Sequence, residues 1–467
     1  MTAQADYVVY HSGPGRAVIA AATLGSGMIM LDGTVVNVAL RTIGGDLDAS
    51  LAQLQWISNG YLLSLAALIL LGGSLGDRYG RRRVFMVGVV WFGLASALCG
   101  LASTPELLVA ARVLQGVGGA LVTPGSLAMI QGSFVRADRA PAIGAWTGLG
   151  SIAAAVGPLV GGALIDYASW RWIFWINIPV AVLTLWITRR AVPESRDAQA
   201  PPSFDVAGAV TTAVALAGVT YALIGWGSAA ALPLAAVGVL AAVAFLLNER
   251  RTAYPMVPPR LFGNRTFGAA NAMTLLVYAA LGAILFFLVL QLQTVVGYTA
   301  LQAGLATLPI TVCMLLLAAR GGALAVRIGP RLPMTFGPLV MAGGVVWLQR
   351  VGADAVYWRD VLPGLTVFAL GLALLVAPLT ATVLAAAPNH LAGTASGINN
   401  AISRTGSLLA VAALPVLVGL SGDDYAVPAV LDAGYGRAML VSAGLLALGG
   451  IGSWLTIPRG LEECRPS

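Results

Sequence analysis

The segment GSLGDRYGRRR, residues 73–83, is the most informative part of the chain. It lies between two uncharged apolar runs, 54–73 and 84–104. A short glycine-containing turn with several arginines, placed between two runs of about 20 apolar residues, is typical of a cytoplasmic loop that joins two transmembrane helices. The stretch therefore predicts a membrane protein and indicates which side of the membrane the turn faces.

The composition extends this prediction to the whole chain. Of the 467 residues, 58% are hydrophobic and only 10% are charged, whereas soluble domains carry about 25% charged residues. The mean hydropathy is +0.86. The formal charge of +7 does not indicate nucleic-acid binding, because the cationic residues are all arginines scattered through short loops. We expect a polytopic membrane protein without a separate soluble domain.

Cysteine and histidine usage predicts neither a disulfide framework nor a metal site. The three cysteines, Cys99, Cys313 and Cys464, are isolated, and the two histidines lie far apart in polar segments. We expect no metal and no cofactor. The first sixteen residues are polar and the apolar run after them is long enough to span, so we interpret that run as a retained helix rather than a signal peptide.

Fourteen apolar runs are each long enough to cross a bilayer as a helix. They cover residues 17–40, 54–74, 84–103, 105–127, 141–164, 173–189, 206–226, 231–248, 268–290, 300–319, 332–349, 361–387, 395–420 and 437–457. The fold class that follows is an all-α polytopic membrane protein with fourteen transmembrane helices.

Two polar segments, 190–205 and 249–267, divide these runs into six, two and six. The predicted organisation is an N-terminal six-helix half (1–190), a linker with two extra transmembrane helices (191–267), a C-terminal six-helix half (268–458) and a cytoplasmic tail (459–467). The segment RGGALAVRIGPR, residues 320–331, is a weak copy of the opening turn without its aspartate. Such repeats are expected of transporters built from two halves.

The arginines test this topology. If the N-terminus lies inside, 19 of the 26 arginines fall on the cytoplasmic side and five on the opposite side. The other two, Arg112 and Arg404, lie within apolar runs. The bias predicts an even number of spans in the inner (cytoplasmic) membrane of the cell, with both termini cytoplasmic.

Four motifs together resemble one family of transporters. The turn at 73–83 resembles the signature loop of the major facilitator superfamily. Three further motifs follow the same order as in that family: LDGTVVNVAL at 31–40, LLVAARVLQGVGGALVTP at 107–124 and GLGSIAAAVGPLVGG at 148–162. With fourteen spans, the chain resembles the fourteen-helix drug:proton antiporter family. The resemblance implies the major facilitator fold, with two six-helix halves plus two extra central helices.

Asp32 is an acid in the middle of the first apolar run. A carboxylate at that depth is costly, so it is normally paired, placed in a watery cavity or protonated. One interpretation is a proton-coupling residue; the other is an aspartate locked structurally by the backbone or by Asn37.

Arg112 is the only charge in the interior of the fourth run. It shares one helix face with Gln115, Gly116, Gly119 and Thr123, at spacings of 3, 4, 7 and 11. That face suits a substrate cavity or a close helix neighbour. The resemblance implies that Arg112 assists proton coupling; the alternative is a counter-ion that only holds helices together.

Small residues recur along one face of the fifth run. Gly150, Gly157 and Gly161 follow helical spacing, and Pro158 and Gly162 are adjacent. Small residues let helices approach closely, and proline bends them. The resemblance implies an antiporter helix that marks exporters; the alternative is ordinary helix packing.

The opening turn has a structural and a functional interpretation. Asp77 is available to nearby arginines and helix N-termini, and Gly73 and Gly80 permit a tight turn. The resemblance implies a cytoplasmic gating loop that stabilises the outward-open state. The alternative is a topological anchor. The loop residues concerned are Gly73, Asp77, Arg78, Gly80, Arg81 and Arg82.

The second half offers weaker signals. Asn400, Arg404 and Ser407 share one face of the run 395–420, which indicates a polar cavity wall or hydrogen bonds between helices. The other candidates for the substrate cavity are Tyr278, Phe286 and Gln291, together with Asn37 in the first run. No acid lies in the interior of the last six runs, which disfavours a strong preference for dications.

The sequence contains no recognisable set of catalytic residues. It also contains no P-loop GxxxxGK[ST], so ATP-driven pumping is not indicated. The resemblance implies a proton-coupled exporter of hydrophobic or amphiphilic small molecules, neutral or weakly cationic, that works by alternating access. The expected partners are the substrate, protons and the lipid bilayer, with the protein a monomer. The alternatives are a dedicated exporter of one metabolite, antibiotic or lipid, and a membrane receptor that transports nothing.

Overall fold

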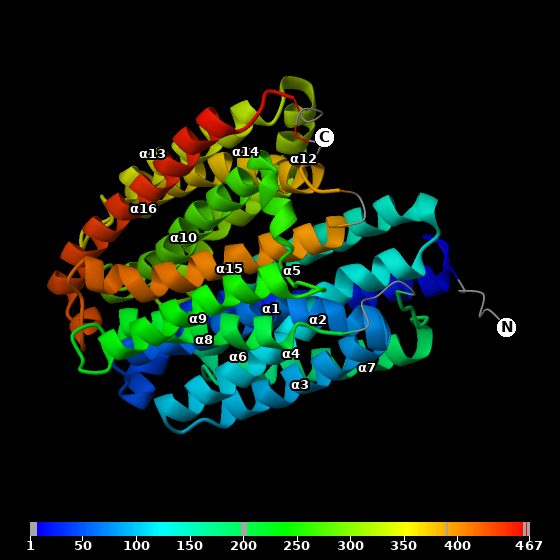
Figure 1. The fold of residues 1–467 in the computed structure, drawn as a ribbon. Helices are drawn as coiled ribbons and strands as arrows, with labels where there is room; N and C mark the ends of the chain where they lie inside the picture. Colours follow the sequence, from blue (N-terminus) through cyan, green and yellow to red (C-terminus); the bar gives the residue numbers. More distant parts are fainter. Residues whose placement is uncertain (1–6, 198–202, 389–390, 461–463, 465–467) are drawn as a thin grey trace.

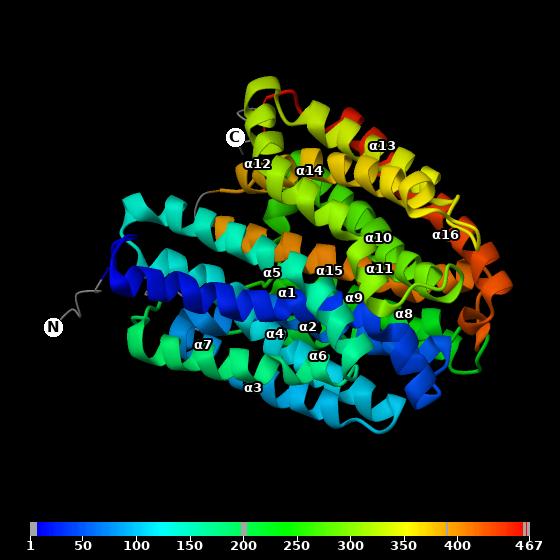
Figure 2. The same ribbon diagram turned by 180° about the vertical axis from the view of Figure 1, so that it is seen from behind.

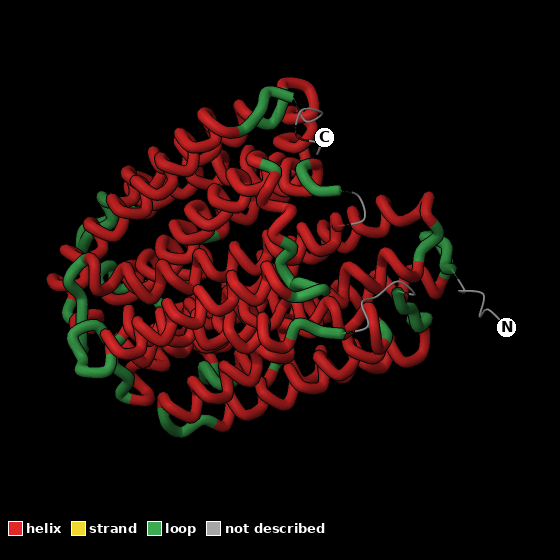
Figure 3. The backbone as a smooth tube through the Cα atoms, in the orientation of Figure 1, coloured by secondary structure: helices red, strands yellow, loops and turns green. Residues whose placement is uncertain are grey.

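The computed structural model describes residues 7–197, 203–388, 391–460 and 464. Fourteen helical spans long and apolar enough to cross a membrane occur in this part of the chain, as the sequence predicts. Figure 1 shows them as two bundles that run side by side, and Figure 2 shows the same arrangement from behind. The tube in Figure 3 places the connecting loops at the two ends of the bundles.

The first bundle holds the first six spans. Its helices are α1 Gly13–Leu47, α2 Leu51–Tyr79, α3 Arg81–Leu101, α4 Pro105–Ser133, α5 Arg139–Tyr167, and the pair α6 Trp172–Trp175 and α7 Asn177–Ala191. The main packing pairs are α2 with α4, α3 with α4, and α1 with both α5 and α7.

The second bundle repeats this packing. Its helices are α10 Arg265–Thr294, α11 Ala300–Ala306 with α12 Leu308–Ile328, α13 Arg331–Leu348, α14 Leu362–Ala385, α15 Ala392–Leu417 and α16 Pro428–Thr456. Here α12 and α13 both pack on α14, and α10 packs on α15 and α16. Each contact has its counterpart in the first bundle, so the weak sequence echo between the halves corresponds to a repeated helix arrangement.

The helices extend beyond the apolar runs that predict them. Helix α1 starts at Gly13, where Ser12 caps it by accepting a hydrogen bond from the Gly15 N–H, and it continues to Leu47. The predicted run 300–319 is divided between α11 and α12, because Pro309 at the start of α12 has no N–H to continue the helical ladder.

The two remaining spans, α8 Val206–Ile224 and α9 Ala231–Arg251, form a pair beside the bundles. Helix α8 packs on both α2 and α15 and therefore covers the seam between the halves. Helix α9 is the least buried span and exposes Leu232, Val239 and Leu240, with Leu232 73% exposed. Such an apolar outer face is suited to lipid.

The bundles meet at one end and diverge at the other (Figures 1 and 2). We call the end that holds residues 73–83 the hairpin end, and the opposite end the closed end. Helix α1 begins and helix α16 ends at the hairpin end. The ribbons of the two halves therefore lie closer together at the closed end than at the hairpin end.

Candidate transport site

A buried ion pair joins α1 to α4 midway through the first bundle. The side chains of Asp32 and Arg112 are each 1% exposed, and Asp32 Oδ2 lies 2.5 Å from Arg112 Nη1. Their opposite charges compensate each other, which makes burial of both in an apolar bundle tolerable. The structure thus brings together the two charged residues that the sequence predicts for proton coupling.

Gln115 closes this pair into a ring of hydrogen bonds. Its Oε1 accepts from Arg112 Nη1 at 2.6 Å, and its Nε2 donates to Asp32 Oδ1 at 2.8 Å. Gln115 therefore touches both charges, three residues after Arg112 on the polar face of α4. The candidate cavity residue of the sequence is a direct partner of the ion pair.

Asn177 is a member of this cluster that sequence reasoning missed. Its Nδ2 lies 3.5 Å from Asp32 Oδ1 and donates to Ser96 Oγ at 3.0 Å. Asn177 is 1% exposed at the start of α7. An asparagine within the predicted transmembrane run 173–189 is the signal that could have identified it. Asn37, in contrast, donates weakly to Gly33 O at 3.5 Å and is not among the described partners of Asp32.

Helix α2 fixes the far side of the arginine. Arg112 Nε donates to Ile57 O at 3.2 Å, and the guanidinium lies 4.4 Å from the centroid of the Tyr61 ring. Close approach of α4 to α2 depends on Gly116, where a Cβ would lie 2.4 Å from Tyr61 O. The arginine is therefore held by an acid, an amide, a carbonyl and an aromatic face together.

The glycine face of α5 packs on both halves. A Cβ at Gly157 or Gly161 would lie within 2.5 Å of Thr34 or Val35 of α1. At Gly162 it would lie 2.5 Å from Leu301 Cα in the second half, and Gly304 approaches the Pro158 carbonyl equally closely. Gly150 is different, because the nearest neighbour of a Cβ there would be Met30 Sδ at 3.8 Å. Four of the five predicted residues of this helix thus lie at tight helix crossings.

Hydrogen bonds tie the halves together at the closed end. Gln55 Nε2 donates to Val411 O at 2.7 Å, and Gln293 Nε2 donates to Val38 O at 2.8 Å. The Tyr425 hydroxyl donates to Ala49 O at 2.7 Å. All hydrogen bonds found between the six-helix halves in the described ranges belong to this end.

The predicted gating loop has a partner within its own half. Asp77 Oδ1 pairs with Arg81 Nη2 at 2.8 Å, one turn along the chain. Gly80 adopts a φ of 113°, which only glycine tolerates well, and this separates α2 from α3. Arg78 lies 4.9 Å from the centroid of the Phe204 ring.

Glu194 is the acid that sequence reasoning missed at this loop. Its Oε1 accepts from the Arg82 backbone N–H at 3.1 Å, at the first turn of α3, and its Oε2 lies 3.7 Å from Arg83 Nε. An anion is favourable at a helix N-terminus. The Ser195 carbonyl accepts from Arg81 N–H at 3.0 Å, so residues 192–197 cover the loop.

The residues predicted for the second half divide into two groups. Phe286 is 1% exposed against Phe287, and Gln291 donates to Val351 O at 2.7 Å and to Asp432 Oδ1 at 2.5 Å. Phe286 therefore packs, and Gln291 forms its hydrogen bonds, within the second half, whereas the ion pair lies in the first half. Tyr278, Asn400 and Arg404 form the other group, on α10 and α15.

Arg404 lies half-buried at the middle of α15. Its Nε is buried without a hydrogen-bond partner. Ser407, on the same face, donates to Tyr278 O at 2.9 Å. Asn400, one turn before Arg404, is exposed and donates to Ser396 O at 3.1 Å. This face is thus a polar wall of which only the serine is bound to a neighbouring helix.

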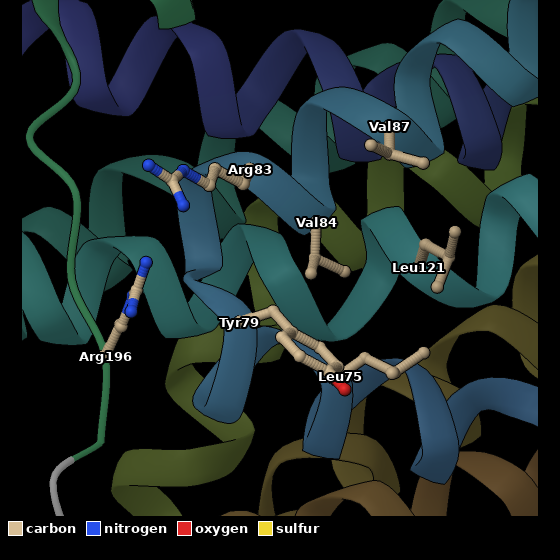
Figure 4. Close-up of a pocket in the computed structure, with 7 residues that line it drawn as sticks. All are labelled: Leu75, Tyr79, Arg83, Val84, Val87, Leu121 and Arg196. Atoms are coloured by element: carbon tan, nitrogen blue, oxygen red, sulfur yellow. The ribbon is translucent and has the colours of Figure 1, made fainter.

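Two shallow grooves lie elsewhere, on the outer surface at the hairpin end. One is lined by apolar side chains of α2, α3 and α4 and bordered by Arg83 and Arg196 (Figure 4). The other lies between α1 and α7, with Arg16 and Arg190 among its residues. Neither contains the ion pair. No group of three histidine, cysteine or acidic side chains able to hold a metal ion occurs in the described ranges.

Comparison with known proteins identifies relatives of the whole chain. The sequence profile of the Major Facilitator Superfamily matches residues 22–411. The puromycin resistance protein of Streptomyces alboniger is 35% identical and covers 96% of this chain and 92% of its own. The tetracenomycin C resistance and export protein of Streptomyces glaucescens is 36% identical, over 85% and 75% of the two chains. The methylenomycin A resistance protein of Streptomyces coelicolor is 34% identical, over 96% and 93%.

Solved structures share the fold at lower identity. A D-xylose–proton symporter superposes with a TM-score of 0.68 at 16% identity, over 95% of this chain and 98% of its own. A bacterial homologue of the human lysosomal transporter Spinster, in an inward-facing and unoccupied conformation, also gives 0.68, at 17% identity over 98% and 99%.

Proposed function

The chain belongs to the major facilitator superfamily, and we propose that it is a proton-coupled exporter of hydrophobic or amphiphilic small molecules. It is a multi-pass membrane transporter rather than an enzyme. Its relatives are antibiotic resistance and export proteins, which supports outward transport. The proposal that export is coupled to protons rests on the ion pair of Asp32 and Arg112.

The observation that carries the proposal is the Asp32–Arg112–Gln115 cluster. Asp32 is the acceptor of both neighbours, so protonation of its carboxyl group removes the charge that holds Arg112. A buried arginine without its anion is costly, and the cluster must then rearrange. In the proposed cycle, the proton on Asp32 and the bound substrate alternate, and Gln115 transmits the change along α4.

We propose that the hairpin end faces the cytoplasm, with both termini there, in the inner membrane. The arginine bias of the loops supports this orientation. With the halves tied at the closed end, the structure then corresponds to the inward-facing state. Export requires the closed-end hydrogen bonds to break while the hairpin end closes. A monomer suffices, because both halves belong to one chain.

In this proposal the loop at 73–83 acts when the hairpin end closes. In the described ranges, the Asp77 side chain pairs within its own half, with Arg81. A contact from Asp77 to the second half is therefore expected in the outward-open state, whereas Glu194 keeps the loop anchored throughout.

A dedicated exporter of a single antibiotic is the second candidate. Three relatives are each named for one antibiotic, and another is named a multidrug resistance protein. The second candidate shares the ion pair and the cycle, and differs only in the range of substrates.

The test compares the wild type with Asp32→Asn, which retains the size of the side chain and removes its charge. Cells that express either protein are exposed to a panel of antibiotics. Transport of the compounds to which the wild type confers resistance is then measured in proteoliposomes with an imposed pH gradient. We expect gradient-driven transport in the wild type and its loss in the variant. Asp354→Asn, at an exposed loop position, is the matched control. Unchanged transport by Asp32→Asn would contradict proton coupling through this residue.

A further inference from the structure

In the part of the chain that the structure describes, no acid pairs with the positive charge of Arg404 on α15. We propose that Arg404 anchors the negatively charged group of the substrate, so that the exported compounds are amphiphilic anions such as carboxylates or acidic phenols. The inference rests on the proposed export function and names the class of substrate for the same pathway.

The first step is the charge balance of the bundle interior. Among the described residues, three charged side chains lie in the middle of a helix and face other helices: Asp32, Arg112 and Arg404. Asp32 and Arg112 compensate each other at 2.5 Å. No acid occurs between residues 250 and 353, nor between 361 and 422. The interior therefore carries one excess positive charge, on the second half.

The second step is the absence of a resident partner. In the described ranges, no carboxylate lies within 4.0 Å of the Arg404 guanidinium, and its buried Nε has no acceptor. An arginine in a membrane interior normally pairs with an acid or with carbonyl groups, because an unpaired charge is poorly tolerated there. Such a charge in a transport pathway marks the place where an oppositely charged group binds.

The third step is the position of Arg404 between the halves. Its helix α15 packs on α10 in its own half and on α2 in the other half. Gly397, two turns before Arg404, lies against Leu70 of α2, and Ser407 donates to Tyr278 O of α10. The Tyr61 ring of α2 lies over Arg112, so α2 contacts both the ion pair and α15. The Tyr61 hydroxyl is buried and has no hydrogen-bond partner in the described structure. Arg404 therefore lies on a helix that packs on α2, the helix that contacts Arg112 of the coupling cluster.

The fourth step concerns chemistry. A guanidinium offers only donors, in a planar fork that fits a carboxylate, and it repels cations. The phenol of Tyr61 and the amide of the exposed Asn400 can add further donors. An anion bound here cancels the excess charge, whereas a cation adds to it. For the charge of the substrate, this inference replaces the expectation of neutral or weakly cationic compounds.

The test uses three fluorescent compounds that share one ring system and differ in charge: dansylglycine (anion), dansylamide (neutral) and dansylcadaverine (cation). Their binding to the purified full-length protein in detergent is measured by energy transfer from tryptophan. We expect dansylglycine to bind about tenfold or more tightly than dansylcadaverine, which corresponds to one hydrogen-bonded charge pair. In Arg404→Gln the difference should fall to about twofold or less, and Arg404→Lys should retain most of it.

Arg437→Gln removes an exposed arginine of α16 and is the matched control, for which the order of affinities should not change. Circular dichroism and gel filtration check that each variant is folded. The anchor is refuted if the wild type does not bind dansylglycine, binds the three compounds equally or prefers the cation. It is also refuted if Arg404→Gln keeps the preference for the anion.

Asp32→Asn separates this inference from the proposed function. If both hold, the variant loses transport driven by a pH gradient but still binds dansylglycine in preference to dansylcadaverine. If the variant continues to transport and still prefers dansylglycine, proton coupling through Asp32 fails and the anchor stands. If the wild type transports with a pH gradient but shows no anionic preference, the anchor fails and the exporter stands.

Discussion

Asp166 at the end of α5 accepts hydrogen bonds from the backbone of the second half, including one of 2.9 Å from the Leu301 N–H. Its other oxygen accepts from the Ala300 N–H at 3.1 Å. The same two residues of α11 pack on Gly162, where a Cβ would clash with them. A carboxylate that accepts two backbone bonds across the seam favours the state closed at this end.

Asp166→Ala should therefore shift the protein away from the closed-end state, with a cost of about 2 kcal/mol or more for the two lost charge-assisted bonds. Spin labels at exposed positions 48 and 423, one in each half, can measure this in a background without the native cysteines. We expect a larger population of long distances in the variant. Asp354→Ala is the control, and identical distance distributions in the two variants would contradict the role of Asp166.

The ion pair makes a second prediction, on stability. Removing one partner leaves the other buried without compensation, which costs about 3–5 kcal/mol, whereas removing both avoids that penalty. Arg112→Leu should lower the melting temperature of the purified protein more than the double variant Asp32→Leu, Arg112→Leu does. Additive effects of the two substitutions would show that the residues are not energetically coupled.

The sequence predicts the charged centre of the site because its signals are local. Asp32 and Arg112 are conspicuous as charges within apolar runs, and Gln115 follows Arg112 on the same helix face. The fourteen spans are predictable for the same reason, since hydropathy and arginine placement are properties of short segments. The helix ends differ from the apolar runs because capping, by Ser12 for example, lies outside the apolar core.

The partners supplied by distant segments could not be predicted in this way. Glu194 and Asp166 lie in polar segments where acids are common, and only the fold brings them to α3 and α11. Asn177 is 145 residues from Asp32. Gln291, a candidate for the substrate cavity, donates to Asp432, and this contact depends on the packing of α10 against α16.

Residues 192–197, which cover the loop at the hairpin end, give a third prediction. Glu194→Gln removes the charge that interacts with Arg82 and Arg83 and with the N-terminus of α3. Residues 192–197 should then exchange their amide hydrogens about tenfold faster, because part of the anchoring is lost. Hydrogen–deuterium exchange with mass spectrometry measures this directly. Asp77→Asn serves as the comparison, and it should leave this segment protected while lowering transport if the loop acts as a latch.

The glycines of α5 give a last prediction, in which one helix supplies both the variant and its control. A Cβ at Gly161 would lie 2.4 Å from Val35 Cγ1, whereas at Gly150 the nearest neighbour would be 3.8 Å away. Gly161→Ala should therefore force α5 and α1 apart, and Gly150→Ala should be tolerated. We expect a loss of about 1–3 kcal/mol in stability and reduced transport for Gly161→Ala only. Equal behaviour of the two variants, in thermal unfolding and in transport, would mean that close contact between α5 and α1 is not needed.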